Sequence, residues 1–353
     1  MMGWFVREDA LRRWLGEILG SGRTLVAPAR RGELKLFQRV AQAGDVDLGP
    51  GLTSWSAKEF LLPRSEPLFH YRLEGKEVRI KDPADDGERF VFFGLRSCDA
   101  AGFLRLDSVF LGERADPFYS RRRGRSSVVA VSCTSPEKEC FCTAVGGGPA
   151  RTAGCDLMLH RLTEGWLMEE CSEKGGELSS LALDRWAEAT PSQAAEAEEA
   201  ERRAREIMPG RAPRLDPAAR SDLFACTHRW DGLAEGCLGC GVCAYVCPTC
   251  TCFDVSDEGG LWGGTRWRCW DGCAFASFTL HASGHNPRPS QTERFRQRIL
   301  HKFDYFPGSN GGLSMCVGCG RCSRLCPAAI DPLDVLLGLQ ARPMEECDVS
   351  GGG

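Results

Sequence analysis

The N-terminal part of the chain alternates between helical and strand-like hydrophobic patterns. Over the first twenty residues, apolar side chains recur at helical spacing with charged residues between them: Trp4, Leu11, Trp14, Leu15 and Ile18. Residues 89–95 and 127–132 are rich in β-branched and aromatic side chains, which is typical of buried strands. Polar and glycine- or proline-rich stretches separate these elements. The pattern predicts an α+β or α/β domain, which we place at residues 1–189.

Residues 190–208 have a different pattern, since they predict a helix that is polar on nearly every side. Thr190 suits the N-cap, Pro191 the first helical position, and Gln193 completes a capping box. Such a helix has no wide apolar face to bury, so we expect a solvated connector. It forms, with the proline-, alanine- and arginine-rich stretch after it, a charged helix and linker at 190–220. A second domain at 221–345 and a tail at 346–353 follow.

The composition is unusual in one residue type, because the chain contains 20 cysteines among 353 residues. The first residues lack the unbroken apolar core of a signal peptide, and no stretch approaches the length of a membrane span. We therefore expect a cytoplasmic protein, and in that reducing compartment clustered thiols indicate metal or redox chemistry. The net charge of −4 gives no reason to expect nucleic acid as a partner.

Two copies of one cysteine motif lie in the second domain. CLGCGVCAYVCP at 237–248 and CVGCGRCSRLCP at 316–327 share the C-x2-C-x2-C-x3-C-P run of bacterial ferredoxins. Zinc ribbons use two C-x2-C pairs without a third close thiol, so two 4Fe–4S clusters are expected instead of zinc. In such runs the fourth cysteine usually binds the other cluster. Cluster 1 is thus assigned Cys237, Cys240, Cys243 and Cys326, and cluster 2 is assigned Cys316, Cys319, Cys322 and Cys247.

The two motifs lie far apart, with 68 residues between Cys247 and Cys316. This insert, and the helix-like run at 293–303, predict a mostly α-helical two-cluster ferredoxin domain and not the compact repeat of small ferredoxins. The second motif also contains Arg321 and Arg324, where the first has neutral side chains. Because positive charge stabilises a reduced cluster, we hypothesise that cluster 2 has the higher potential.

Twelve cysteines remain outside the two motifs. Four of them form either a third Fe–S site at strand ends or a set of unrelated buried thiols, since C-x-C spacing is not diagnostic: Cys98, Cys133, Cys140 and Cys142. Four others are expected to pack around the clusters and exclude water, with another metal site as the alternative: Cys250, Cys252, Cys269 and Cys273. We expect no metal role for Cys155, Cys171, Cys226 and Cys347.

Several strings resemble one known family. RCWDGCAFASFTLHASGHNPRPSQTERFRQRILHKFDYFP, GLRSCDAAGFLRLDSVFL, DPFYSRRR and CFCTAVGGGP are similar to the beta subunits of cytoplasmic nickel–iron hydrogenases (sulfhydrogenases) and to the A-type subunits of anaerobic sulfite reductases. The likeness runs from about residue 90 to 340. Ser97 departs from it, because many relatives have proline there. The resemblance implies a relay between a flavin- and NAD(P)-binding subunit, which would hold FAD, and a catalytic metal subunit. It also favours a site at the four N-terminal cysteines.

We therefore predict an iron–sulfur electron-transfer subunit of a multi-subunit, hydrogenase-like oxidoreductase, without catalytic residues of its own. A relay of the anaerobic sulfite reductase type is an alternative. Two other classes of function are a self-contained flavin-dependent reductase and a metal-stabilised scaffold without redox turnover. The sequence contains neither a P-loop nor a dinucleotide-binding fingerprint, which favours a flavin bound to a partner.

Overall fold

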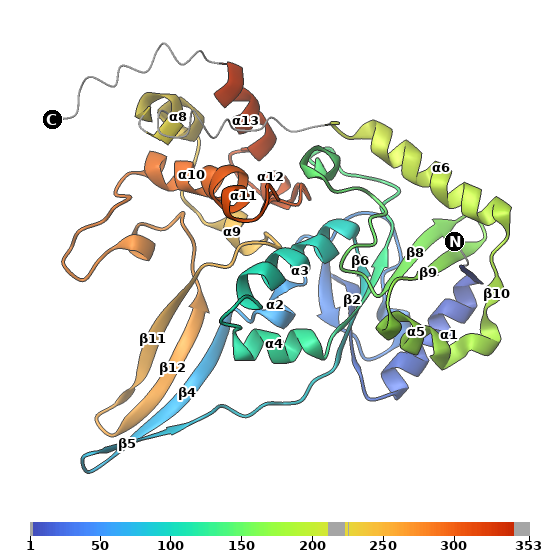
Figure 1. The fold of residues 1–353 in the computed structure, drawn as a ribbon, viewed down its shortest axis with the longest axis horizontal. Coiled ribbons are helices and arrows are strands. Elements are labelled where there is room, and N and C mark those ends of the chain that lie inside the picture. Colours follow the sequence, from blue (N-terminus) through green and yellow to red (C-terminus); the bar gives the residue numbers. More distant parts are fainter. Residues whose placement is uncertain (1–2, 211–222, 225, 342–353) are drawn as a thin grey trace.

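The computed structural model describes residues 3–210, 223–224 and 226–341, and its N-terminal part is built on one mixed sheet (Figure 1). The eight strands lie in the order β10–β1–β9–β8–β7–β6–β2–β3. Strands β2, β6, β7 and β8 run parallel, and the flanking strands pair antiparallel. The bounds are β1 Trp4–Val6, β2 Thr24–Arg31, β3 Leu34–Arg39, β6 Phe90–Leu95, β7 Ser127–Val131, β8 Leu157–Leu162, β9 Gly165–Glu170 and β10 Ala187–Glu188.

Side chains of this sheet alternate between two apolar cores. On β6, Phe93 packs into one core with α1 (Glu8–Gly20), whereas Phe92 packs into the other with α3 (Ser97–Phe110). Because helices cover both faces, β6 and β7 are apolar along nearly their whole length. The strands predicted at 89–95 and 127–132 are β6 and β7, so the predicted mixed α and β character is confirmed. The predicted first helix forms as α1, which buries Leu11, Trp14, Leu15 and Ile18, but Trp4 was wrongly included, because it lies in strand β1.

The helix predicted at 190–208 forms as α6 (Pro191–Ile207), with the predicted capping box at its start. It is not a solvated connector, because Ala197 and Ala204 are buried and α6 contacts β8 and β9. Residues 211–220 of the predicted linker and the tail at 346–353 lie outside the described residues. Shorter elements of this part are η1 Ala43–Asp45, α2 Lys58–Leu61, α4 Pro117–Gly124, η2 Cys142–Val145, α5 Glu173–Ser179 and η3 Ser180–Arg185.

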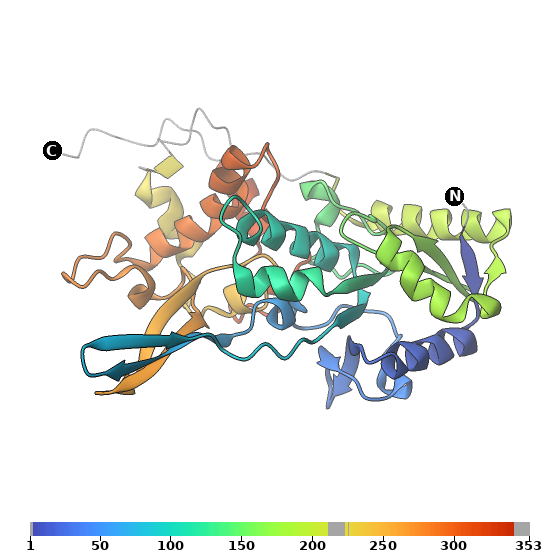
Figure 2. The same cartoon turned by 60° about the horizontal axis from the view of Figure 1, so that its bottom comes forward.

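A second, four-stranded antiparallel sheet combines segments from both halves of the chain. Its order is β11–β12–β4–β5, with bounds β4 Ser65–Glu74, β5 Glu77–Lys81, β11 Phe253–Gly260 and β12 Gly263–Trp270. Strand β12 comes from the insert between the two cysteine motifs and pairs with β4, for example Cys269 with Ser65. The sheet projects from the body as an arm (Figures 1 and 2). The division at 1–189 and 221–345 stays a prediction.

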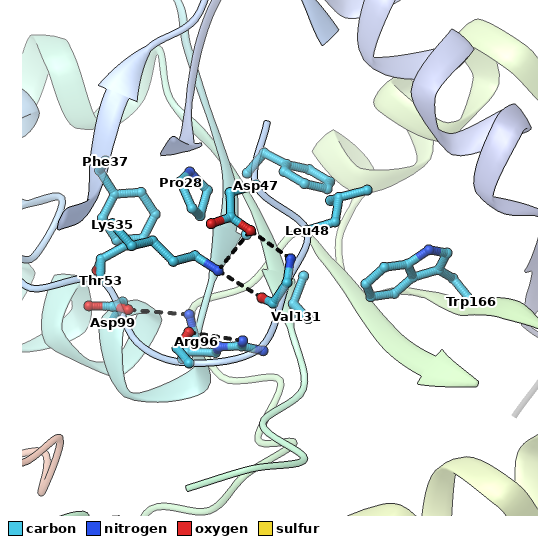
Figure 3. Close-up of a pocket in the computed structure, with 14 residues that line it drawn as sticks. Pro28, Lys35, Phe37, Asp47, Leu48, Thr53, Arg96, Asp99, Val131 and Trp166 are labelled. Atoms are coloured by element: carbon cyan, nitrogen blue, oxygen red, sulfur yellow. Dashed lines mark hydrogen bonds and ion pairs between the residues drawn. The ribbon is translucent and has the colours of Figure 1, made fainter. Parts of the chain in front are cut away.

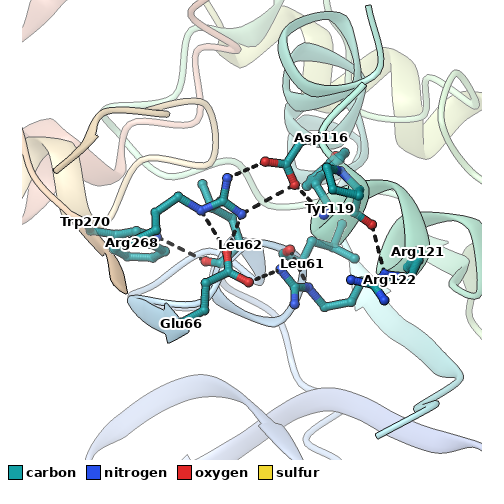
Figure 4. Close-up of polar contacts among 10 residues, drawn as sticks. Leu61, Leu62, Glu66, Asp116, Tyr119, Arg121, Arg122, Arg268 and Trp270 are labelled. Carbon is teal, nitrogen blue, oxygen red and sulfur yellow. Dashed lines mark hydrogen bonds and ion pairs between the residues drawn. The ribbon is translucent and has the colours of Figure 1, made fainter. Parts of the chain in front are cut away.

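A buried ion-pair network fixes the base of this arm (Figure 4). Arg268 of β12 pairs with Glu66 of β4 and with Asp116, the N-cap of α4. Arg122 of α4 donates to the same glutamate at 2.7 Å. Because Arg268 and Glu66 are almost fully buried, each charge depends on its partners. The network therefore holds the arm against the N-terminal sheet domain.

The part that carries the two motifs consists of short helices, loops and the strands β11 and β12. Its helices are α8 Thr227–Ala234, α9 Val242–Tyr245, η5 Ala276–Thr279, α10 Gln291–Leu300, the π-helical turn η6 His301–Tyr305, α11 Phe306–Ser309, α12 Arg321–Arg324 and α13 Pro332–Ala341. Helix α10 confirms the helix expected near 293–303, and Phe295 and Ile299 place it in a core with Trp230 of α8. The helical content is modest, because two long strands occupy the insert. None of the described helices is long and apolar enough to cross a membrane.

Candidate iron–sulfur sites

The cysteines assigned to cluster 2 come together in one buried pocket. It is lined by Cys243 and Cys247 from the first motif and by Cys316, Cys319 and Cys322 from the second. Cys247, Cys316 and Cys319 are buried. Four thiols around an enclosed, mainly apolar space are the donor set of a cubane cluster. Four of these thiols therefore fit a 4Fe–4S cluster, and the fold brings Cys247 beside the cysteines of the second motif, while its assignment to cluster 2 stays a prediction.

The glycines of the second motif are required by its surroundings. Gly318 and Gly320 have φ values of 64° and 68°, the left-handed region that favours glycine. A Cβ atom on Gly318 would lie 2.5 Å from the backbone of Phe141 and Cys142, and one on Gly320 would lie 2.6 Å from the carbonyl oxygen of Glu139. The cluster 2 loop is therefore pressed directly against the N-terminal domain.

Helix α10 and the turn after it place polar groups at both motifs. Gln291 Nε2 donates to Cys237 Sγ at 3.2 Å, and Lys302 Nζ donates to Cys247 Sγ at 3.5 Å and to Thr249 Oγ1 at 3.0 Å. Arg298 lies between Gln291 and Lys302 in the sequence. Burial lowers its pKa, but the negative charge of nearby thiolates, Cys243 first among them, outweighs this effect and raises the pKa. One helical face thus supplies donors and cations to both cluster sites.

Hydrogen bonds, nearby charge and burial shift the pKa values of these thiols in opposite directions. A hydrogen bond from Cys250, together with the ammonium of Lys302 and the hydroxyl of Thr249, holds the pKa of Cys247 well below its usual range. Burial instead raises the pKa of Cys319 to about 11 and also raises that of Cys316. Cluster ligands must be thiolates, so Cys247 is prepared for a cluster, whereas the other two must lose protons when it binds.

Arg321 of the second motif has a buried partner that the sequence did not predict. Arg321 is fully buried and forms an ion pair with Asp99 of α3 at 2.7 Å, and it donates to Thr53. That carboxylate balances part of its charge, and Arg321 also opposes the effect of burial on the pKa of Cys319. Lys302 is the buried cation that contacts a cluster 2 thiol directly. The higher potential of cluster 2 stays a prediction, with Lys302 as its main physical reason.

The site of cluster 1 is nearer the surface. Burial, together with the neighbouring thiols of Cys273 and Cys237, raises the pKa of Cys243. Cys240 is exposed. Helices α9 and α12, which contain the third cysteine of each motif, contact each other. Cys326 is half-buried just after α12, and its assignment to cluster 1 stays a prediction.

The four N-terminal cysteines also meet in one pocket, which is lined by Cys98, Cys133, Cys140 and Cys142. Cys98 follows β6, Cys133 follows β7, and the other two lie on the loop after β7. Arg96 fixes the two strand ends, because its guanidinium donates to the carbonyl oxygens of Ser132 at 2.9 Å and Gly51 at 3.2 Å. Sequence spacing left this grouping open, and the fold brings the residues together.

Arg96 also lines a neighbouring pocket that contains Lys35 and Asp47 (Figure 3). Lys35 Nζ donates to the carbonyl oxygen of Gly49 at 2.7 Å and lies 3.5 Å from Asp47. Burial lowers the pKa of Lys35, while Asp47 opposes this effect. The charged groups of this pocket satisfy each other within the fold, so we assign it no ligand.

The other cysteines lie in varied places. Cys250 contacts Cys247, and Cys252 and Cys273 lie near each other, in agreement with packing around the clusters. Cys269 contacts Ser65 on the exposed arm. Within the described ranges, no three Cys, His, Asp or Glu side chains converge as ligands of one metal ion. Cys347 lies outside the described residues.

Sequence reasoning missed Gln291, Lys302 and Asp99 as neighbours of the cysteines. A usable signal existed for two of them. Gln291, Arg298 and Lys302 are spaced by seven and four residues, which places them on one face of a helix. The partnership of Asp99 with Arg321 joins distant segments and has no local sequence signal.

Comparisons with known proteins agree with this geometry. Residues 236–330 match the family described as 4Fe-4S dicluster domain. Over 312 residues the chain is 35% identical to sulfhydrogenase 2 subunit beta of Pyrococcus furiosus, an alignment that covers 88% of this chain and 90% of that protein. No solved structure matches the chain significantly.

Proposed function

Because the chain belongs to the family of sulfhydrogenase beta subunits, we propose that it is the iron–sulfur electron-transfer subunit of a multi-subunit oxidoreductase. The observation that carries this proposal is the buried pocket that Cys247 shares with Cys316, Cys319 and Cys322. This pocket joins cysteines of two motifs that are separated by 68 residues, as expected if two clusters are held close together. Close clusters are suited to electron transfer.

The bound clusters supply one-electron chemistry. The chain's own residues hold them, exclude water and stabilise the thiolate charge. At cluster 2, Lys302 donates to Cys247, and at cluster 1, Gln291 donates to Cys237. We assign the chain no catalytic residue, since its role is to position two redox centres.

We further propose that the relay connects a flavin- and NAD(P)-binding subunit with a catalytic metal subunit, as in a hydrogenase. FAD would belong to the first of these partners. The relative named as a sulfhydrogenase subunit supports the hydrogenase assignment over a sulfite reductase. Exposed Cys240 and Leu238, which is 72% exposed, lie at the cluster 1 loop and suit an exchange point with a partner. A cytoplasmic location under anaerobic conditions would keep the thiols reduced.

Metal analysis of anaerobically purified protein tests the core of this proposal. We expect about eight irons from the two clusters, and a loss of about four in Cys319→Ala. Cys269→Ala is the matched control, because Cys269 is a thiol on the arm, and it should keep the full iron content. Zinc in place of iron, or an unchanged iron content in Cys319→Ala, would contradict the two-cluster assignment.

Copurification with the natural complex tests the partner assignment. Tagged protein should bring down a nickel-containing subunit and a flavin-containing subunit. Recovery of a sirohaem-containing partner would instead support the sulfite reductase type of relay. FAD that stays with the isolated chain would support the self-contained reductase.

A further inference from the structure

The N-terminal pocket is a product of the sheet topology. Strands β6 and β7 are parallel neighbours, so their carboxyl ends meet at one edge of the sheet. Cys98 lies just after β6 and Cys133 just after β7. The loop that leaves β7 returns across this edge with Cys140 and Cys142. In open α/β sheets this edge is where ligands bind.

The loop is held in place by contacts that do not use its thiols. The backbone N–H of Cys133 and the hydroxyl of Ser97 both donate to the carbonyl oxygen of Pro149, at 2.9 Å and 3.0 Å. The N–H of Gly147 donates to the carbonyl oxygen of Cys142 at 2.8 Å, and a Cβ on Gly147 would lie 3.0 Å from that oxygen. The loop therefore presents its thiols from a fixed backbone.

The surroundings of these thiols suit an anionic cluster. Leu52 and Met208 give the pocket an apolar wall, which excludes water. The guanidinium of Arg96 borders the pocket and donates to backbone carbonyl oxygens. A cation at the wall stabilises the negative charge of four thiolates and an iron–sulfur core.

The pocket shares a wall with the cluster 2 site. Cys319 lines both pockets. The N–H of Phe141 donates to the carbonyl oxygen of Gly318 at 2.8 Å, and the thiol of Cys140 lies 3.8 Å from the carbonyl oxygen of Cys319. One layer of backbone thus separates the N-terminal thiols from a cluster 2 ligand.

We propose that Cys98, Cys133, Cys140 and Cys142 bind a third 4Fe–4S cluster, and that cluster 2 stands between it and cluster 1. Its use in a relay rests on the proposed electron-transfer function, but its existence does not. In the relay step one cluster is oxidised by one electron while its neighbour is reduced by one, and no bond is made or broken. The electron comes from a reduced flavin on a partner subunit.

Counting clusters on the full-length chain tests this proposal. Native mass spectrometry of anaerobically purified protein should give a mass with three cubanes, and iron analysis about twelve irons. Cys133→Ser should lower the iron content to about eight and remove one of three reduced-cluster signals in electron paramagnetic resonance. Cys171→Ser is the control, because it removes a thiol of the same domain that does not line the pocket.

The possible outcomes separate this proposal from the previous one. Two cubanes on the unaltered chain, with Cys133→Ser unchanged, would overturn the third cluster and leave the electron-transfer function standing. A chain without iron would overturn both. Zinc in the N-terminal pocket would overturn the third cluster alone. Mass spectrometry of the unaltered chain keeps the test decisive even if a variant does not fold.

Electron paramagnetic resonance can also test whether cluster 2 lies between the other two clusters. Magnetic coupling falls steeply with distance, so the third cluster should broaden the signal of cluster 2 more than that of cluster 1. In Cys133→Ser the signal of cluster 2 should sharpen while that of cluster 1 stays the same. Equal sharpening of both signals would overturn the linear order.

Discussion

The two copies of the cysteine motif have nearly the same local structure and very different surroundings. In each, two glycines adopt positive φ, with values of 64° and 75° in the first and 64° and 68° in the second, and a four-residue helix follows. The first copy exposes Leu238 and Cys240. The second is buried against the loop around Phe141. The motif therefore specifies the turn, whereas the fold around it decides whether a cluster lies at the surface or inside.

Exchanging the centre of the second motif for that of the first should have the largest effect. Arg321→Val places the first motif's residue type in the second and leaves Asp99 buried without its partner. We expect a loss of about 3–5 kcal/mol in the free energy of unfolding, because an unpaired buried charge is costly. Chemical denaturation of the anaerobic protein measures this. The double variant Asp99→Val with Arg321→Val should recover much of the loss, and failure to do so would show that the ion pair is not the cause.

Replacing one glycine in each motif should destabilise the second motif more than the first, with losses of stability smaller than that of Arg321→Val. Gly318→Ala forces a Cβ against backbone atoms, so we expect a loss of about 2–3 kcal/mol from strain and overpacking. Gly239→Ala meets the end of the flexible Gln291 side chain, and we expect about 1 kcal/mol from its positive φ. Thermal unfolding of both variants checks the difference. Equal losses would mean that the surroundings of the second motif do not constrain it.

The buried second motif should make the cluster-free protein sensitive to alkaline pH. Burial raises the pKa of Cys319 to about 11, so the folded state keeps a proton that the unfolded state loses near its ordinary thiol pKa. Stability is therefore present below the unfolded pKa and falls as the pH rises toward 11, by about 2 kcal/mol for this thiol. Denaturation of the cluster-free chain between pH 8 and 11 measures it. Cys319→Ala should make the curve shallower, although Cys316 still contributes, and an unchanged curve would contradict the assignment.

The smallest expected effects are shifts of cluster potential. Lys302→Met removes a charged donor from Cys247, so the potential of cluster 2 should fall by on the order of 50–100 mV, the equivalent of one charge-assisted hydrogen bond. Gln291→Ala removes a neutral donor from Cys237 and should lower the potential of cluster 1 by roughly 20–40 mV. Redox titration followed by electron paramagnetic resonance resolves both. Arg324→Gln is the comparison, and a larger shift there than in Lys302→Met would restore the arginines as the main influence.

The sequence predicted those elements whose signal is local. The strands β6 and β7, the amphipathic α1, the capped α6 and the helix after Ser290 all follow from short patterns. The arm was not predicted, because β4 and β12 are far apart in the sequence and pair only in the folded chain. The polar residues of β11 also lack the hydrophobic pattern that predicts a strand. The burial of Lys302 was missed for a related reason, since a lysine in sequence gives no sign that thiols will surround it.

The pairing of β4 with β12 also sets the order of events during synthesis. Ser65 and Cys269 are 204 positions apart, so β4 lacks its neighbour until most of the chain has left the ribosome. The loop around Phe141 likewise waits for Gly318. Contacts of such long range form late and slowly. We expect cofactor loading to follow completion of the polypeptide, so that a truncated chain is left without its inner cubane and is open to proteolysis.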